Sequence, residues 1–398
     1  AQAILAQARA LLLSLQSPLG SLGRMGCGAS IPATNAPSES TGVTQPKEPW
    51  RWGLTVQQLF DLGAEIFGSP QETYKTAMEV IDFGMGMYQQ TAKKFKCEPD
   101  GFGGWKFNDL EEMSDKAKMN LYDVVKTVTA SKTKGSGVSY SVLVNSGDHK
   151  EAEVFVSHAW AEKFAYFVFV LCFELFPASM FQGDDSDPMS QEELEEGKAT
   201  WRKVLGNGDS ALLPSTVIWV CALCIDQNAD IQGELGGSVE ESPFAQVLWR
   251  AMTKRVLVVY NPAISLYSRI WCCYEIFLAI KKQTEDSTFT IQTIGIPARK
   301  VKNDFEDYFG GHDGDRFVKL RCSDIAEDFD KVAEAATPWV EEFCSKHPLD
   351  VTEAKASVEA DRQMILGALG DTTPKVNEMV NTLRKKMFLR LMPLIMEG

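Results

Sequence analysis

Six residues have side chains and positions that could carry out chemistry: Ser157, His158, Trp160, Asp226, Gln227 and Glu275. A carboxylate or an imidazole at a ligand site can transfer protons, and an aromatic wall can stack on a flat ligand. Each key residue also has a structural interpretation. Glu275 could be a solvated helix carboxylate, His158 a strand-end histidine bonded to backbone, and Asp226 the cap of a loop.

Short β-branched runs alternate with helical patterns through the middle of the chain, which predicts βαβ units and a parallel sheet flanked by helices. The expected strands are Val154–Val156, Thr216–Cys221, Arg255–Tyr260 and Phe289–Ile294, with a possible fifth at Arg316–Leu320. The expected helices are a run from Trp160, then Phe244–Met252, Ile270–Lys281 and Ala298–Tyr308.

In such a sheet the ligand binds beyond the carboxyl ends of the strands. The first strand delivers Ser157, His158 and Trp160 to that crevice, and the third delivers Asn261 and Pro262. The second strand delivers Asp226 and Gln227. Glu275, one turn into the third helix, is expected to face the same crevice.

Four segments in this order resemble the Toll/interleukin-1 receptor (TIR) domain, whose flavodoxin-like α/β fold this implies for residues 151–322. The first strand ends in a Phe-x-Ser segment, and the second ends in Cys-Ile-Asp-Gln before a long loop. Ser242–Val259 matches the helix and strand that follow. Residues 267–276, YSRIWCCYEI, are similar to the plant-type S-x-W-C-x-x-E box, with one extra spacer residue.

Residues 218–227, IWVCALCIDQ, also resemble the W-x-x-x-x-C-I-[DN]-Q signature of heterokaryon-incompatibility domains, which are thought to share a TIR-like core. The chain departs from the TIR pattern at three places, the first of which is a long insertion between the first helix and the second strand. His158 stands where many TIR domains have Tyr, Phe or Arg, and the loop Asn228–Glu241 is acidic and Gly-rich.

The resemblance implies two functions of different classes. Many TIR domains hydrolyse NAD at the nicotinamide–ribose bond, with the glutamate of this box, here Glu275, as the catalytic residue. A carboxylate there would stabilise an oxocarbenium-like ribosyl cation, and Trp160 would stack on a base. NAD would then be a substrate, and no cofactor is expected. The alternative is a non-catalytic module that self-associates or binds other TIR-like domains at a membrane surface.

Composition narrows the partners. The chain of 398 residues has a formal net charge of −14, which argues against nucleic acid as the main partner. Its nine cysteines are odd in number and scattered, which indicates a reducing compartment. Cys221 and Cys224 are expected on opposite faces of a strand, and without a second CxxC or paired histidines no metal site is predicted.

The N-terminal region contains Met25-Gly26-Cys27-Gly28-Ala29-Ser30, which fits an N-myristoylation pattern at Gly26 with Cys27 free for palmitate. Three interpretations stay open: a chance match, a start at Met25 behind a translated leader, and a targeting peptide over residues 1–24. The expected location is cytoplasmic, with attachment to a membrane through lipid if Met25 is the start.

The remaining organisation follows from composition. Residues 25–49 are a flexible linker, residues 50–150 a mostly helical region, and residues 323–398 a helical C-terminal region. No transmembrane segment is predicted, because the most apolar run, Phe164–Phe176, is short and contains Glu174. The helix from Trp160 to Phe176 is apolar nearly all round, so it is expected to be deeply covered or to be partly a surface for self-association.

Overall fold

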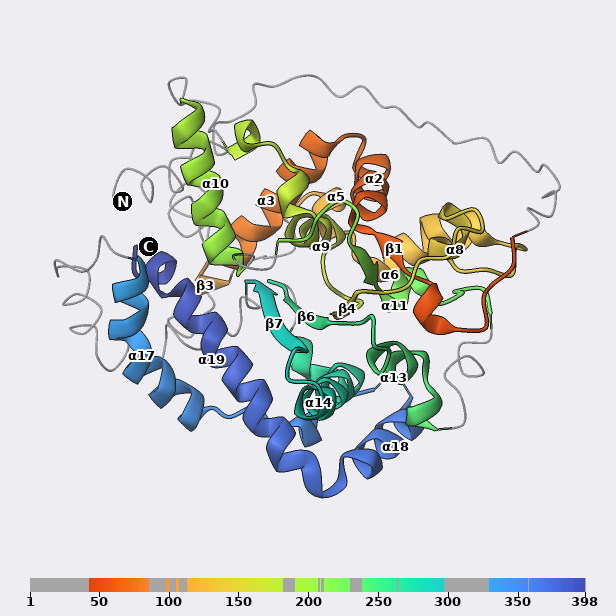
Figure 1. Ribbon diagram of the computed structural model, residues 1–398. Helices are drawn as coiled ribbons and strands as arrows, with labels where there is room; N and C mark the ends of the chain where they lie inside the picture. The colour runs from red at the N-terminus through yellow and green to blue at the C-terminus, as the bar shows by residue number, and fades with distance from the viewer. Residues whose placement is uncertain are drawn as a thin grey trace.

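The computed structural model describes residues 43–85, 98–99, 105–106, 113–181, 190–206, 208, 211–229, 238–262, 265–296, 329–356 and 358–397. These residues form an α/β fold in which helices cover both faces of a five-stranded, mostly parallel sheet (Figure 1). A separate two-stranded pair joins β2 (Glu98–Pro99) to β3 (Trp105–Lys106).

The main sheet has the order β1-β5-β4-β6-β7. Its strands are β1 (Leu54–Thr55), β5 (Val217–Trp219), β4 (Val154–Ser157), β6 (Arg255–Tyr260) and β7 (Thr290–Gly295). All adjacent pairs run parallel except β1 and β5, which are antiparallel. The central strands are buried on both faces, as their continuous apolar sequences predict. A strand is present at each of the four positions predicted in this region, although β5 is shorter than predicted.

The strand β4 is the switch point of the sheet. The next strand along the chain, β5, lies on one side of it, and β6 lies on the other. The connections that leave the carboxyl ends of β4 and its neighbours therefore diverge, and this is the edge at which a doubly wound sheet binds its ligand.

Helices α2 (Val56–Phe67) and α3 (Pro70–Met85) pack on α9 (Phe164–Leu171) over one face (Figure 1). The helix α2 begins with a capping box between Thr55 and Gln58 and ends at Gly68, which has a left-handed φ of 101°. On this side lie also α10 (Gln191–Leu205) and the short elements η3 (Phe173–Leu175) and η4 (Ala178–Phe181).

All eight side chains of α9 are buried, and α2 and α3 pack against this helix. The apolar surplus of this helix is therefore explained by a second layer of helices within the same chain. It does not form a free self-association surface, and Phe167 and Phe169 are both 0% exposed.

The N-terminal region is mostly helical, and its β1 extends the sheet. Between residues 113 and 150 the helical structure consists of several short pieces. These are α5 (Asp115–Lys118), α6 (Leu121–Val124), a π-helical segment η2 (Val125–Thr129), α7 (Ala130–Thr133) and α8 (Tyr140–Val144). One continuous apolar core includes residues on both sides of residue 150.

The opposite face is covered by α13 (Pro243–Leu248) and α14 (Ile270–Glu285), which follow η5 (Val239–Glu241) and η6 (Leu266–Ser268) (Figure 1). The C-terminal helices α18 (Glu359–Leu369) and α19 (Thr373–Glu397) pack on α14, and α17 (Phe329–Lys346) packs on α19. Short turns η7 (Val351–Glu353) and η8 (Gly370–Thr372) join them.

One strand prediction is wrong in part. The strand β5 ends at Trp219, and Cys221–Cys224 forms a single helical turn, α11, so the two thiols do not alternate across a sheet. The predicted elements Ala298–Tyr308 and Arg316–Leu320, and the acylation residues Gly26 and Cys27, lie outside the described residues. None of the described helices has the length and apolar character needed to cross a membrane.

Candidate functional site

A serine–glutamate pair lies where β4 ends. Ser157 is the last residue of β4, and Glu275 lies in the second turn of α14 and faces it. The Ser157 Oγ donates a hydrogen bond of 2.5 Å to Glu275 Oε2. Ser157 is 0% exposed and Glu275 4% exposed. The structure thus joins two residues that are far apart in sequence and that were both predicted to line the crevice.

The charge of Glu275 is governed by its burial. Desolvation raises the pKa of this carboxyl to about 8, and the hydrogen bond from Ser157 opposes the rise. At neutral pH most molecules therefore carry a protonated Glu275. A carboxyl whose pKa lies near neutrality is the kind of group that active sites use for acid–base or electrostatic work.

His158 is held in one tautomer by its neighbours. Its Nδ1 lies 3.1 Å from the carbonyl oxygen of Val156, so we assign the ring proton to Nδ1. Its Nε2 is then an acceptor, 3.5 Å from Cys221 Sγ. Burial lowers the pKa of His158 to about 4, so the ring is neutral at pH 7. The contact with backbone matches the structural interpretation of this histidine.

Trp160 and Cys221 close the same cluster. The Trp160 Nε1 donates to Cys221 Sγ at 3.1 Å, and Cys272 Sγ lies 3.4 Å from the carbonyl oxygen of His158. Burial raises the pKa of the Cys221 thiol well above its usual value, so the thiol stays protonated. The tryptophan is therefore fixed by a hydrogen bond to sulfur beside the Ser157–Glu275 pair, although its ring is only half-buried.

Asp226 and Gln227 organise their own loop. The Asp226 carboxylate accepts a hydrogen bond from the backbone N–H of Asn228 at 3.0 Å, as a turn-capping aspartate does. The Gln227 Nε2 donates to the carbonyl oxygens of Ile225 (3.1 Å) and Cys221 (3.5 Å). Within the described residues neither side chain is hydrogen-bonded to Ser157 or Glu275. These two predicted residues border the cluster but do not join it.

The helix that carries Glu275 is anchored by Trp271. Its ring stacks on Phe244 of α13 with centroids 5.0 Å apart, and its Nε1 donates to Asp361 of α18 at 3.2 Å. Two separate helices therefore fix the first turn of α14. This placement holds Glu275 by packing on a rigid element, which limits how far the carboxyl can move.

A second buried carboxyl was missed by sequence reasoning. Glu162 is 0% exposed, and neither of its oxygens has a hydrogen bond of ordinary geometry within the described part of the chain. Desolvation raises the pKa of Glu162 well above its usual value, and the neighbouring Asn261 side chain partly offsets this. The one signal available was an acidic residue two positions before the apolar run from Phe164. That signal does not distinguish a buried carboxyl from a solvated one.

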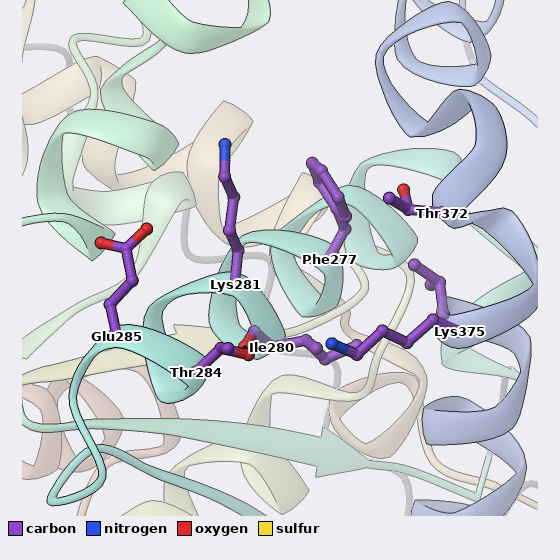
Figure 2. A pocket seen from close by; sticks show the side chains of 8 residues that line it. Phe277, Ile280, Lys281, Thr284, Glu285, Thr372 and Lys375 are labelled. Carbon is purple, nitrogen blue, oxygen red and sulfur yellow. Dashed lines mark hydrogen bonds between the residues drawn. The ribbon is translucent and has the colours of Figure 1, made fainter.

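A shallow hollow of about 280 Å³ lies elsewhere, between the outer side of α14 and the start of α19 (Figure 2). Phe277, Ile280 and Val376 are its apolar lining residues. Its other lining residues are Lys281, Thr284, Glu285, Thr372 and Lys375. None of the predicted site residues contributes to it, so this hollow and the Ser157–Glu275 pair are separate features.

The described residues contain no group of three or more His, Cys, Asp or Glu side chains arranged to hold a metal ion. The six cysteines that the structure describes are buried and unpaired: Cys172, Cys221, Cys224, Cys272, Cys273 and Cys344. Comparisons of the chain with protein families, with curated proteins and with solved structures found no match. The candidate site therefore rests on its own geometry.

Proposed function

We propose that this protein is a TIR-like signalling module that hydrolyses NAD at the nicotinamide–ribose bond. Two features support the proposal. The order β5-β4-β6-β7 corresponds to the 2-1-3-4 order of flavodoxin-like sheets, which bind ligands at the switch point. The observation that carries it is the Ser157–Glu275 pair, which sets a carboxyl of raised pKa at that point.

In the proposed reaction the bond between the ribose C1′ and the nicotinamide nitrogen breaks, and nicotinamide leaves with the bonding electrons. The ionised form of Glu275, which is the minor form at neutral pH and grows toward pH 8, stabilises the positive charge that develops on the ribose. Water then adds to C1′ and loses a proton, which gives ADP-ribose. Ser157 orients Glu275 through its hydrogen bond, and the fixed Trp160 ring offers a stacking surface. Because Glu275 is 4% exposed, substrate binding requires the crevice to open.

Nicotinamide release from NAD by the full chain, assayed at high protein concentration, tests the proposal. We expect Glu275→Gln, which keeps the shape and removes the charge, to lower the rate by about a hundredfold or more. Glu285→Gln is the matched control, since Glu285 is exposed on the same helix. Absence of turnover in the wild type would leave the non-catalytic module as the surviving function. Full activity of Glu275→Gln would place the catalytic carboxylate elsewhere.

Membrane attachment through acylation of Gly26 and Cys27 is a separate part of the proposal. One acyl chain alone binds membranes only marginally, so stable attachment requires palmitate on Cys27 as well as myristate on Gly26. Intact mass spectrometry of the protein from a eukaryotic host would reveal both groups.

A further inference from the structure

Arg390 of α19 approaches the outer edge of β7 in an unusually close packing arrangement. Its Nη1 donates a 2.6 Å hydrogen bond to the carbonyl oxygen of Thr293. The guanidinium also lies against Gly206, the residue that ends α10 with a left-handed φ of 76°. A Cβ at Gly206 would overlap Nη1, so only glycine leaves room for this arginine. Figure 1 shows α19 passing β7 and the lower end of α10.

The contacts above do not account for the other edge of the Arg390 guanidinium, which carries Nε and Nη2. The Nε and Nη2 atoms of Arg390 are both shielded from solvent, and neither has a hydrogen-bond partner among the residues that the structure describes. These two nitrogens point in the same direction and form the fork that binds carboxylates and phosphates bidentately. Arg202 of the same protein uses this fork on Glu174, with Nε and Nη2 at 2.6 and 2.8 Å from the carboxylate oxygens.

The surroundings do not balance the charge of Arg390. Its described electrostatic neighbours are the hydroxyls of Tyr166 and Tyr260. The Tyr166 hydroxyl already donates to the Tyr260 carbonyl and accepts from the N–H of Ile296. Burial lowers the pKa of Arg390 to about 10, which leaves the group positively charged at neutral pH.

A second arginine of α19 adds to this positive region. Arg384 is 5% exposed, and its Nη2 donates to the carbonyl oxygen of His347. Its Nε is buried and has no hydrogen-bond partner within the described part of the chain. It lies close enough to Tyr260 to act on that hydroxyl together with Arg390. Among the described residues neither arginine is paired with a carboxylate, so two positive charges converge on one tyrosine.

We infer that the Nε–Nη2 fork of Arg390 is a binding site for a phosphate-type dianion, either inorganic phosphate or the phosphoryl group of a nucleotide. A structural role in pinning the edge strand β7 accounts for Nη1 alone. A buried charge without a partner is strongly destabilising, and an anion with two or more acceptor oxygens satisfies both orphan donors at once. The nearby charge of Arg384 favours a dianion over a monocarboxylate.

This inference does not rest on NAD hydrolysis, because the fork lies beside β7 and the Ser157–Glu275 pair lies at β4. The test uses binding, not turnover. Thermal unfolding of the full chain is followed in inorganic phosphate and in sodium chloride of equal ionic strength. We expect phosphate to raise the melting temperature by several degrees in a saturable way, since a ligand that binds only the folded state stabilises it.

Variants connect that shift to Arg390. We expect Arg390→Met to weaken phosphate binding at least about tenfold, since it removes two charge-assisted hydrogen bonds. Gly206→Ala should weaken binding too, because it displaces the guanidinium. Lys386→Met, an exposed position on the same helix, should bind as wild type does. If Arg390→Met fails to fold, Gly206→Ala and Arg390→Lys are compared with wild type by isothermal titration.

The choice of anion separates the sources. Inorganic phosphate, pyrophosphate, ADP-ribose and succinate are titrated in parallel. Tighter binding of ADP-ribose than of phosphate indicates a nucleotide phosphoryl group, and the reverse order indicates free phosphate. Stabilisation by succinate but by no phosphate compound would overturn the phosphate assignment. Equal phosphate shifts in wild type and in all Arg390 and Gly206 variants, or no shift in any of them, would overturn the site.

Discussion

The carboxyl edge of β4 and the outer edge of β7 both bury ionisable side chains, and they differ in how the charge is balanced. At β4, Glu275 and Glu162 can become neutral by taking up a proton, and their raised pKa values reflect this. At β7, Arg390 keeps its charge, and two of its buried donors have no partner in the described ranges of the chain. An unpaired buried acid therefore points to a titration, whereas an unpaired buried arginine points to a bound anion.

A carboxyl introduced into buried α9 should behave like Glu275 and Glu162 and become neutral by taking up a proton. Phe167 is 0% exposed, so Phe167→Glu is expected to lower the free energy of unfolding by at least about 4 kcal/mol near pH 8. The loss should be smaller at pH 5, because the introduced group can then be neutral. Circular dichroism during thermal unfolding measures both, with Leu213→Glu as an exposed control at 63%.

A Phe167→Glu protein as stable as wild type would contradict the burial of α9. If Phe167→Glu instead folds and converts an oligomer into monomers, α9 is an association surface and is not covered within the chain.

Lys282 is a buried cation whose donors are all hydrogen-bonded, so it tests the opposite case to Arg390. The Lys282 ammonium donates to the carbonyl oxygens of Leu248, Arg250 and Thr253 at 2.7, 2.6 and 2.6 Å. Its three protons are used within the chain, so no external anion is needed. We expect Lys282→Met to cost about 3 kcal/mol in urea unfolding, through loss of three charge-assisted hydrogen bonds.

The neighbouring Lys281→Met is the control, since Lys281 is exposed. The comparison between paired and unpaired cations predicts that phosphate stabilises the Lys282→Met variant as much as wild type. A phosphate response that disappears with Lys282 would contradict it.

The titration of Glu275 gives the smallest of these effects. Its pKa is about 8 in the folded protein and near 4.5 when unfolded, so the folded state binds more protons between these values. Stability should therefore fall as the pH rises from 4.5 to 8, and Glu275→Gln should remove this slope. We expect the variant to gain about 2 kcal/mol on wild type across the window, after allowance for local relaxation.

Urea unfolding at pH 5 and pH 8 for both proteins measures this difference. A constant difference between the two proteins would show that Glu275 is already ionised at pH 5. The pH profile of nicotinamide release should then lack the rise toward pH 8 that an ionising Glu275 predicts.

The sequence predicted the positions of the strands because each contains a local run of β-branched or aromatic residues. The clearest run, Arg255–Tyr260, is buried over nearly its whole length. It predicted the position of Glu275 because the preceding Trp271 marks the start of a helix. It misassigned Cys221–Cys224, because a short apolar sequence is compatible with a strand and with a buried helical turn equally. Sequence reasoning did not identify Glu162 or Arg390. The burial and the hydrogen bonding of these two side chains depend on the tertiary arrangement.

The apolar surplus of α9 illustrates the same limit. Periodicity revealed that the helix has more apolar surface than one face requires. It did not reveal that α2 and α3, which lie far earlier in the sequence, cover that surface. Sequence patterns identify which apolar surfaces must be buried, and the tertiary structure shows which elements bury them.

The antiparallel pairing of β1 with β5 has a consequence for synthesis of the chain. Leu54 pairs with Ile218, so roughly 160 residues must be made after β1 before its partner exists. At ribosomal speed the apolar faces of the first helices wait on the order of ten seconds for α9 and β5. We expect nascent chains that stall in this interval to depend on chaperones. Fragments that begin after Thr55 would leave the edge of β5 open to pairing with other chains.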